Sequence, residues 1–541
     1  MKTLIAALLF TITSSILSQS TYTNIQISNL SGPNEPSICI NPKNTNQIVA
    51  GANTDKVYRS TDGGLTWTFT TLTSTYTVWG DPCIITDTLG NFYYFHLVNG
   101  AGFIDRMGCQ KSTNAGTSWS AGTFWQFNGK QQDKEWAITD FTGGPRGNWI
   151  FVSWTEFDNY GTPNPADSSR ILFARSTDGG TSFTGITRLS KLGGDCVDED
   201  YTTEGAVPAV GPNGEIYVAW AGPQGTNNFK IFFDRSTDGG TTWLDNDIIA
   251  ASQPGGWDLG SGSPTGRGIL GIYRGNGLPV TVCDISNGPY RGTIYINYLD
   301  SVGTRDRDVK IVKSTNGGLN WSAPIRVNDD AAGKEQFFTW LTIDRVTGYL
   351  YCVFYDRRNY TDNQTDVFLA RSTNGGTTWV NERISSSPFL PAYNIFFGDY
   401  NNISAHNGII RPIWIRLVSG TLSVWTAVIN YPVGITQISG EIPETFQLSQ
   451  NYPNPFNPST KIKFDIPAIE AGTAFDVRIR VYDVLGKQVA VIVNQKMASG
   501  TYEYEWNAAD LTSGVYFYTL DVKDSKSKGI YRETRKMVLT K

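Results

Sequence analysis

The 541-residue chain has few residues of the kinds on which several functional classes depend. It contains two histidines, His96 and His406, which argues against metal chemistry built on imidazole. Only 17% of the residues are charged, and the formal net charge is −5. Nucleic acid is therefore excluded as the main partner, because phosphate binding needs a concentrated basic face. Beyond the N-terminal region no segment reaches ~18 continuous apolar residues, so no membrane span is expected.

Cysteine is also scarce and widely spaced. The six residues do not show the spacing of a disulfide framework or of a zinc site. Cys39, Cys83 and Cys352 lie in apolar runs typical of strands, which favours buried thiols, with pairing in an oxidising compartment as the alternative.

Aromatic residues (13%) and glycines (56) are abundant, a composition that suits an all-β protein with many turns. The N-terminus, residues 1–20, carries one lysine, an apolar run from Leu4 to about Ile12 and a short polar stretch. This pattern predicts a secretory signal peptide and an exported protein.

One short motif occurs six times: RSTDGGLTW at Arg59, KSTNAGTSW at Lys111, RSTDGGTSF at Arg175, RSTDGGTTW at Arg235, KSTNGGLNW at Lys313 and RSTNGGTTW at Arg371. The Asp or Asn is expected to bond the backbone two residues on, and the glycine pair supplies positive φ for a tight hairpin turn. The aromatic residue begins the next strand and is expected to fill the wedge between neighbouring sheets. The motif residues expected to have these structural roles are Asp62, Asn114, Asp178, Asp238, Asn316, Asn374, Trp67, Trp119, Phe183, Trp243, Trp321 and Trp379.

These copies resemble the Asp box, or BNR repeat, of sialidase-like β-propellers. The resemblance implies a propeller over residues 21–430, with the boxes on its bottom face. A second repeat, a strand that begins near an acid, precedes each box and occurs a seventh time at Gly398. We predict seven blades, with the strand Tyr22–Ser28 completing the last one; six blades are the alternative.

The chain changes character after residue 430, and 431–442 read as a linker. Residues 443–541 alternate strands with glycine turns, which predicts a small β-sandwich. The stretches NYPNPFNPST and LTSGVYFYTL resemble the type A C-terminal sorting domain of the type IX secretion system, which has an immunoglobulin-like fold. This resemblance implies a Gram-negative host, partnership with the type IX machinery and export across the outer membrane.

The acids at the starts of the inner strands are the candidate site, because ligand sites of propellers cluster at the top, around the channel mouth. They are Glu35, Asp81, Asp133 or Glu135, Glu204, Glu335 and Asp399. Crowded carboxyls raise one another's pKa, so Asp81, Glu135 and Glu204 are the candidate catalytic groups. Calcium is the candidate cation for the ring, and capping of backbone groups at the rim is the structural alternative.

Arg357 and Arg358, beside Asp356, are expected to bind an anionic group through bidentate guanidinium contacts. Trp257 is expected to stack on a sugar, and Asp399 joins this ligand-binding set.

Sialidases resemble one another in an arginine triad whose first member lies early in the first blade. This chain has no Arg before Arg59, which belongs to a box, so the triad does not map onto it. We therefore expect a secreted or cell-surface protein that recognises glycan or protein ligands through its top face without catalysis. The alternative is a glycoside hydrolase or lyase acting on an acidic polysaccharide, with sialic acid cleavage less favoured.

Overall fold

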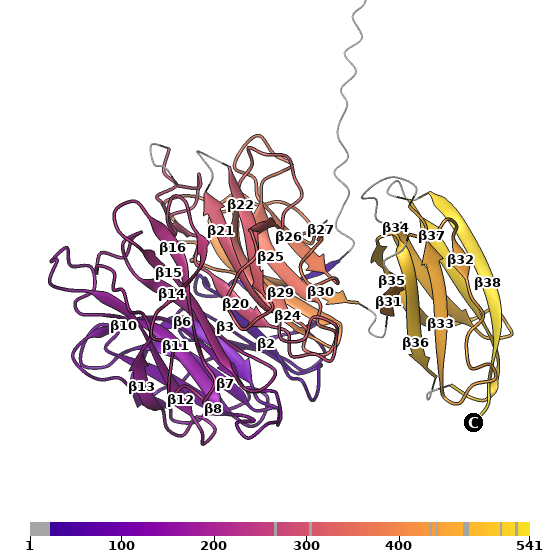
Figure 1. The fold of residues 1–541 in the computed structure, drawn as a ribbon, viewed down its shortest axis with the longest axis horizontal. Helices are drawn as coiled ribbons and strands as arrows, with labels where there is room; N and C mark the ends of the chain where they lie inside the picture. The colour runs from indigo at the N-terminus through magenta and orange to yellow at the C-terminus, as the bar shows by residue number, and fades with distance from the viewer. Residues whose placement is uncertain are drawn as a thin grey trace, which may run out of the picture.

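The computed structural model describes residues 22–264, 268–301, 306–431, 435–439, 442–468, 475–508, 511–524 and 528–541. The predicted signal peptide, residues 1–20, lies outside them. Within the described residues every regular element is a β-strand, and none is a helix that could cross a membrane. Figure 1 shows two groups of strands, one coloured from indigo to orange and one in yellow.

The first group consists of seven four-stranded antiparallel sheets, the number of blades expected. Six of the sheets each use four consecutive strands. The first contains β2 (Ser37–Ile40), β3 (Ile48–Ala52), β4 (Lys56–Ser60) and β5 (Thr68–Thr71), the second β6 (Thr77–Thr86), β7 (Phe92–Asn99), β8 (Arg106–Ser112) and β9 (Thr123–Trp125), and the third β10 (Gln131–Thr139), β11 (Ile150–Phe157), β12 (Ser169–Ser176) and β13 (Thr184–Arg188). The fourth contains β14 (Glu204–Val210), β15 (Ile216–Pro223), β16 (Phe229–Ser236) and β17 (Ile248–Ser252), the fifth β20 (Val280–Cys283), β21 (Ile294–Ser301), β22 (Arg307–Ser314) and β23 (Ile325–Arg326), and the sixth β24 (Gln336–Ile343), β25 (Leu350–Asp356), β26 (Asp366–Ser372) and β27 (Val380–Arg383). A two-stranded ribbon, β18 (Asp258–Gly260) with β19 (Gly275–Asn276), separates the fourth sheet from the fifth.

The seventh sheet closes the ring. It contains β28 (Asn402–His406), β29 (Ile409–Val418), β30 (Thr421–Asn430) and, at its outer edge, the N-terminal strand β1 (Thr23–Ser28). Thr23 pairs with Val428, as the sequence predicted for the unpartnered first strand. The first strands of all seven sheets line one central cavity of about 130 Å³, so the sheets surround a common channel.

The Asp boxes hold the turns between third and fourth strands. In the fourth sheet the Asp238 carboxylate accepts bonds from the Thr241 and Thr242 amides at 3.0 and 2.9 Å. The partners are three and four residues on, not two as expected, because the Ser236 hydroxyl caps the Gly240 amide at 2.8 Å instead. Both glycines of the pair have positive φ, 79° and 85°.

The box aromatics lie between neighbouring sheets. Trp243 of the fourth sheet meets Phe173 of the third edge-on at 4.9 Å, and Trp321 of the fifth meets Phe233 of the fourth at 5.1 Å. In five of the six motifs the basic residue at the start also donates a hydrogen bond to the next box, as Arg235 does to the Gly317 carbonyl at 2.7 Å. The seventh sheet has no box, and there Arg411 donates to the Gly63 carbonyl of the first at 2.7 Å.

The second group of strands is a sandwich. One sheet has the order β31 (Ile435–Ser439), β36 (Gly500–Asn507), β33 (Ser459–Ile466), β32 (Gln447–Leu448); the other has β35 (Gln488–Met497), β34 (Phe475–Tyr482), β37 (Gly514–Lys523), β38 (Gly529–Leu539). Side chains of both sheets share one core. The predicted linker 431–442 is therefore too long, because Ile435 in β31 pairs with Tyr504 and belongs to this sandwich.

All six cysteines lie in the described chain, and each is a free thiol. Five are buried and Cys39 is half-buried, which agrees with the interpretation as small core residues.

Candidate functional site

The top of the channel is shaped by an irregularity that recurs at the start of the inner strands. Pairing shifts between Gly80 and Cys83, Asp133 and Trp136, Glu204 and Val207, and Phe337 and Trp340. Each shift contains a residue with positive φ: Asp81 (53°), Lys134 (53°), Gly205 (76°) and Phe338 (49°). Such bulges bend a strand and redirect its side chains. They place the acids of these strands around the channel mouth.

A cavity of about 30 Å³ lies between these strand starts and the ribbon β18–β19. It is lined by Asp81, Asp133, Lys134, Asp198, Glu204, Trp257, Arg274, Asn276, Leu278 and Asp399. We call the acidic centre the seven carboxyls Glu35, Asp81, Asp133, Glu135, Asp198, Glu204 and Asp399 together with Lys134 and Arg274. Glu35 and Glu135 adjoin the lining residues, since Asp81 acts electrostatically on both.

Arg274 links the two sides of the acidic centre. Its Nε lies 3.1 Å from Asp399 Oδ1, a second nitrogen contacts Asp399 Oδ2, and Nη1 lies 3.1 Å from Asp198 Oδ2. Burial alone would raise the pKa of Asp399, but the guanidinium of Arg274 holds it below its usual value. Asp399 is thus the ionised partner of this arginine.

Four other carboxyls of the acidic centre are shifted in the opposite direction. Burial and neighbouring carboxylates hold the pKa of Glu35, Asp133, Glu135 and Glu204 well above the usual range. Glu204 is hydrogen-bonded to Asp198, and Glu35 to Asp81. A neighbouring carboxylate disfavours ionisation of Glu204 and Glu35, because two adjacent negative charges repel each other.

Two carboxyls of the acidic centre have oxygens that no donor reaches. Glu135 and Glu204 are 1% and 4% exposed. No hydrogen-bond partner in the described chain reaches either oxygen of Glu135 or Oε2 of Glu204. Lys134 places its ammonium 3.6 Å from the centre of the Tyr400 ring rather than on a carboxylate. A group that donates hydrogen bonds or carries positive charge would satisfy these oxygens.

Aromatic side chains connect the acidic centre to the surface. Trp79 and Phe103 are each 44% exposed and meet edge-on at 5.1 Å. Phe103 lies 5.8 Å from Tyr160, whose hydroxyl donates to Asp198 at 2.7 Å. We call Trp79, Phe103 and Tyr160 the aromatic rim.

Among the residues predicted from the sequence, Asp81, Glu204, Asp399 and Trp257 line the cavity, and Glu135 lies beside it. Trp257 is 5% exposed, and its indole nitrogen donates to the Thr202 carbonyl at 3.2 Å. It is therefore part of the cavity wall rather than an exposed stacking platform. Glu335 does not join the ring, because it forms buried ion pairs with Arg307 and Arg357 at 2.8 and 2.6 Å.

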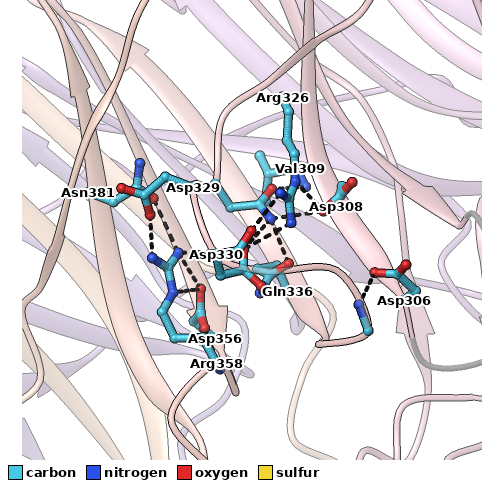
Figure 2. A network of polar contacts seen from close by, with 12 residues as sticks. Asp306, Asp308, Val309, Arg326, Asp329, Asp330, Gln336, Asp356, Arg358 and Asn381 are labelled. Carbon is cyan, nitrogen blue, oxygen red and sulfur yellow. Dashed lines mark hydrogen bonds and ion pairs between the residues drawn. The ribbon is translucent and has the colours of Figure 1, made fainter. Parts of the chain in front are cut away.

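The expected anion site at Arg357 and Arg358 is wrong. Arg357 is 4% exposed and donates to Glu335, the Thr365 hydroxyl and the Leu270 carbonyl. Figure 2 shows Arg358 held by Asp356 and Asp329, with Asn381 nearby. The guanidinium also covers the Phe368 ring at 4.2 Å. Both arginines are bound by acids of this chain, and the buried Asp356 serves that pairing rather than a ligand.

Sequence reasoning did not select Arg274, Asp198, Lys134 or Tyr160. Arg274 lies in the segment between the fourth and fifth sheets, residues 253–279, and Asp198 in the long segment between β13 and β14. Unusual loop length marks both segments. Nothing in their composition indicates which residue faces the channel.

The expected calcium ion stays a prediction. Within the described residues no three His, Cys, Asp and Glu side chains are grouped so as to hold a metal ion.

Comparison with known proteins identifies the C-terminal module. Residues 450–532 match the family model described as the secretion system C-terminal sorting domain. A xyloglucanase from Paenibacillus sp. is 26% identical over 300 residues, which are 50% of this chain and 26% of the relative. The chain thus spans about a quarter of the length of the curated relative it matches.

Two enzymes of known structure are similar to the chain at low sequence identity. Hadza microbial sialidase Hz136 is 12% identical, with a TM-score of 0.41 over 71% of this chain and 73% of that one. A polysaccharide lyase, ulvan lyase PL25, is 12% identical, with a TM-score of 0.45 over 75% and 96%. At such scores the propeller assignment depends on the sheet order and channel described above.

The chain is thus an all-β protein, a β-propeller of seven four-stranded sheets followed by a C-terminal sorting domain. The sorting domain makes it a cargo of the type IX secretion system, exported to the cell surface or beyond it.

Proposed function

We propose that the acidic centre and the aromatic rim bind a glycan outside the cell without cleaving it. One continuous set of contacts supports this proposal: the exposed Trp79 and Phe103 lead to Tyr160, Tyr160 donates to Asp198, and Asp198 meets Arg274. Aromatic faces pack on the apolar faces of sugars, and carboxylates accept bonds from sugar hydroxyls. The combination of an apolar wall and convergent acceptors suits a saccharide.

The carboxyl spacing favours binding over cleavage. Glycosidases hold their two carboxyls about 5–5.5 Å apart when retaining and about 6.5–9.5 Å apart when inverting. The side chains of Glu204 and Asp198, and those of Glu35 and Asp81, instead interact directly with each other. Neither pair is therefore set apart as the acid and the base of a glycosidase are.

A glycoside hydrolase or lyase is the second candidate, and one observation favours it. Around Arg274 the pKa of Asp399 is lowered while burial and nearby carboxylates raise that of Asp133, and a split of this kind is how an acid and a base are distinguished at one pH. The curated relative is named a xyloglucanase, which supports a polysaccharide as the ligand class.

The test is a panel of neutral, basic and acidic polysaccharides offered to the full chain, with both retained binding and released sugar measured. Retention without release supports recognition, and release of a product establishes the enzyme. Trp79→Ala and Phe103→Ala should each weaken retention. The matched control is Phe69→Ala, which removes an exposed aromatic from the outer strand β5. Failure of every polysaccharide to bind would contradict the proposal.

A further inference from the structure

The charge of the acidic centre restricts which glycan it accepts. Five carboxyls line the cavity and those of Glu35 and Glu135 adjoin it, against the two cations Lys134 and Arg274 among the described residues. Arg274 is already shared between Asp198 and Asp399. An anionic sugar would add negative charge to a group of carboxyls that already suppress one another's ionisation. The acidic centre therefore disfavours uronic and sialic acids.

One carboxyl oxygen in the cavity wall is available to accept a hydrogen bond from a ligand. Glu204 is 4% exposed, lines the cavity and has no hydrogen-bond partner for Oε2 in the described chain. Asp133 and Asp198 line the same cavity and are half-buried, so they face solvent on one side. The unpaired buried oxygen is an observation independent of the number of acids, since most buried carboxylate oxygens are hydrogen-bonded.

The size of the cavity indicates what enters it. Its volume of about 30 Å³ admits one or two water-sized groups and no sugar ring. An ammonium group has that size and brings three donors. The ring that carries it would remain outside, where the aromatic rim provides an apolar surface.

We propose that the ligand is a glycan with free primary amines, and that one ammonium group enters the cavity and is held by Glu204, Asp133 and Asp198. This inference rests on the proposed glycan binding. The sugar ring packs against Trp79 and Phe103, and the positive charge neutralises the carboxyls around the channel mouth. An N-acetylated sugar lacks the charge and is too bulky at this position.

The experiment is a calorimetric titration of the full chain with three oligosaccharides of equal length: a glucosamine oligomer, its N-acetylated counterpart and an oligouronate. We expect the glucosamine oligomer to bind about tenfold or more tightly than the N-acetylated one, because a charge pair is lost on acetylation. The oligouronate should bind more weakly still.

Variants assign the preference to the cavity. Glu204→Gln and Asp133→Asn should each weaken binding of the glucosamine oligomer by about tenfold, and each should reduce its advantage over the N-acetylated oligomer. Glu505→Gln, which removes an exposed acid from β36, is the matched control. Thermal melting confirms that each variant is folded, and the three-ligand comparison on the unaltered chain needs no variant.

Equal binding of the acetylated and free oligomers, or tightest binding of the oligouronate, would overturn this inference and leave glycan recognition standing. Absence of binding by every saccharide would overturn both. Capture of a lysine-rich peptide with no binding of the glucosamine oligomer would also overturn it, because the ammonium would then come from a protein.

Discussion

Carboxyl groups at the bottom and at the top of the propeller differ in how many of their oxygens accept hydrogen bonds. At the bottom, Asp238 accepts four hydrogen bonds from its own turn, two from amides and two from hydroxyls. At the top, Glu204 is more deeply buried, contacts another acid and has one oxygen without a partner. A carboxylate whose oxygens accept hydrogen bonds stabilises the fold. A buried carboxylate with an unpaired oxygen destabilises the fold, and a ligand that donates to this oxygen removes that cost.

The pKa values follow the same division. Burial alone would raise the pKa of Asp62, but hydrogen bonds from Thr66, Ser60 and Leu65 together lower it to about 2. Burial and the charges of Asp198 and Asp133 raise that of Glu204. The first carboxylate contributes stability above its ordinary pKa of 3.8, and this contribution is lost as the pH falls toward 2. The second opposes folding increasingly as the pH rises above its ordinary 4.5.

The largest expected effect concerns the bottom. Trp243→Ala removes an indole that packs between the third and fourth sheets against Phe173. We expect a loss of about 3–5 kcal/mol in the free energy of unfolding, through the cavity that remains. Chemical denaturation measures it. A variant that unfolds like the parent would show that this aromatic does not hold the two sheets together.

A smaller loss is expected for Asp238→Ala. It deprives two turn amides of their acceptor at a half-buried site, which should cost about 1–2 kcal/mol, as the loss of a helix cap does. The effect should persist at every pH above about 4, because the lowered pKa keeps this carboxylate ionised. Asp238→Asn is the control: Asn occupies the same place in three other boxes, and most of the stability should return.

The sequence predicted the bottom of the molecule better than the top. Each box carries its own hydrogen-bond partners within a few residues, so a local motif encodes the turn, and six copies gave the sheet order. The acidic centre combines residues far apart in the chain, such as Asp198, Arg274 and Asp399. Arg357 looked available because its partner Glu335 lies more than twenty residues away. Arg358 looked available because nothing local shows that Asp356, two residues before it, and the distant Asp329 both bind it. Sequence can show that an acid starts a strand, but not which arginine reaches it.

Glu204→Gln at the top should stabilise the protein, whereas the two substitutions at the bottom destabilise it. Replacing a buried acid that lacks a donor with a neutral isostere should stabilise the protein by about 1 kcal/mol at pH 8. The gain should shrink toward pH 4.5, where the parent glutamate is itself protonated in the folded state. Unfolding by denaturant at pH 8 and at pH 4.5 measures the gain in stability and its decrease with pH. Destabilisation at pH 8 would mean that the Glu204 carboxylate has a structural partner in the folded protein and is not an open ligand-binding group.

The smallest expected effect lies between neighbouring boxes. Arg235→Met keeps the aliphatic stem but removes the bond from the guanidinium to the Gly317 carbonyl of the next sheet. Arg235 is half-buried, so water can replace the lost donor and the cost should be about 0.5–1 kcal/mol. Arg411→Met is the informative companion, because that arginine is 3% exposed and donates to the carbonyls of Gly63, Ile410 and Ile429 at the closure of the ring. Its loss leaves buried carbonyls unpaired and should cost more than Arg235→Met. If the two variants unfolded at the same denaturant concentration, the seam between the seventh and first sheets would depend on the pairing of β1 with β30 and not on the arginine that replaces the missing box.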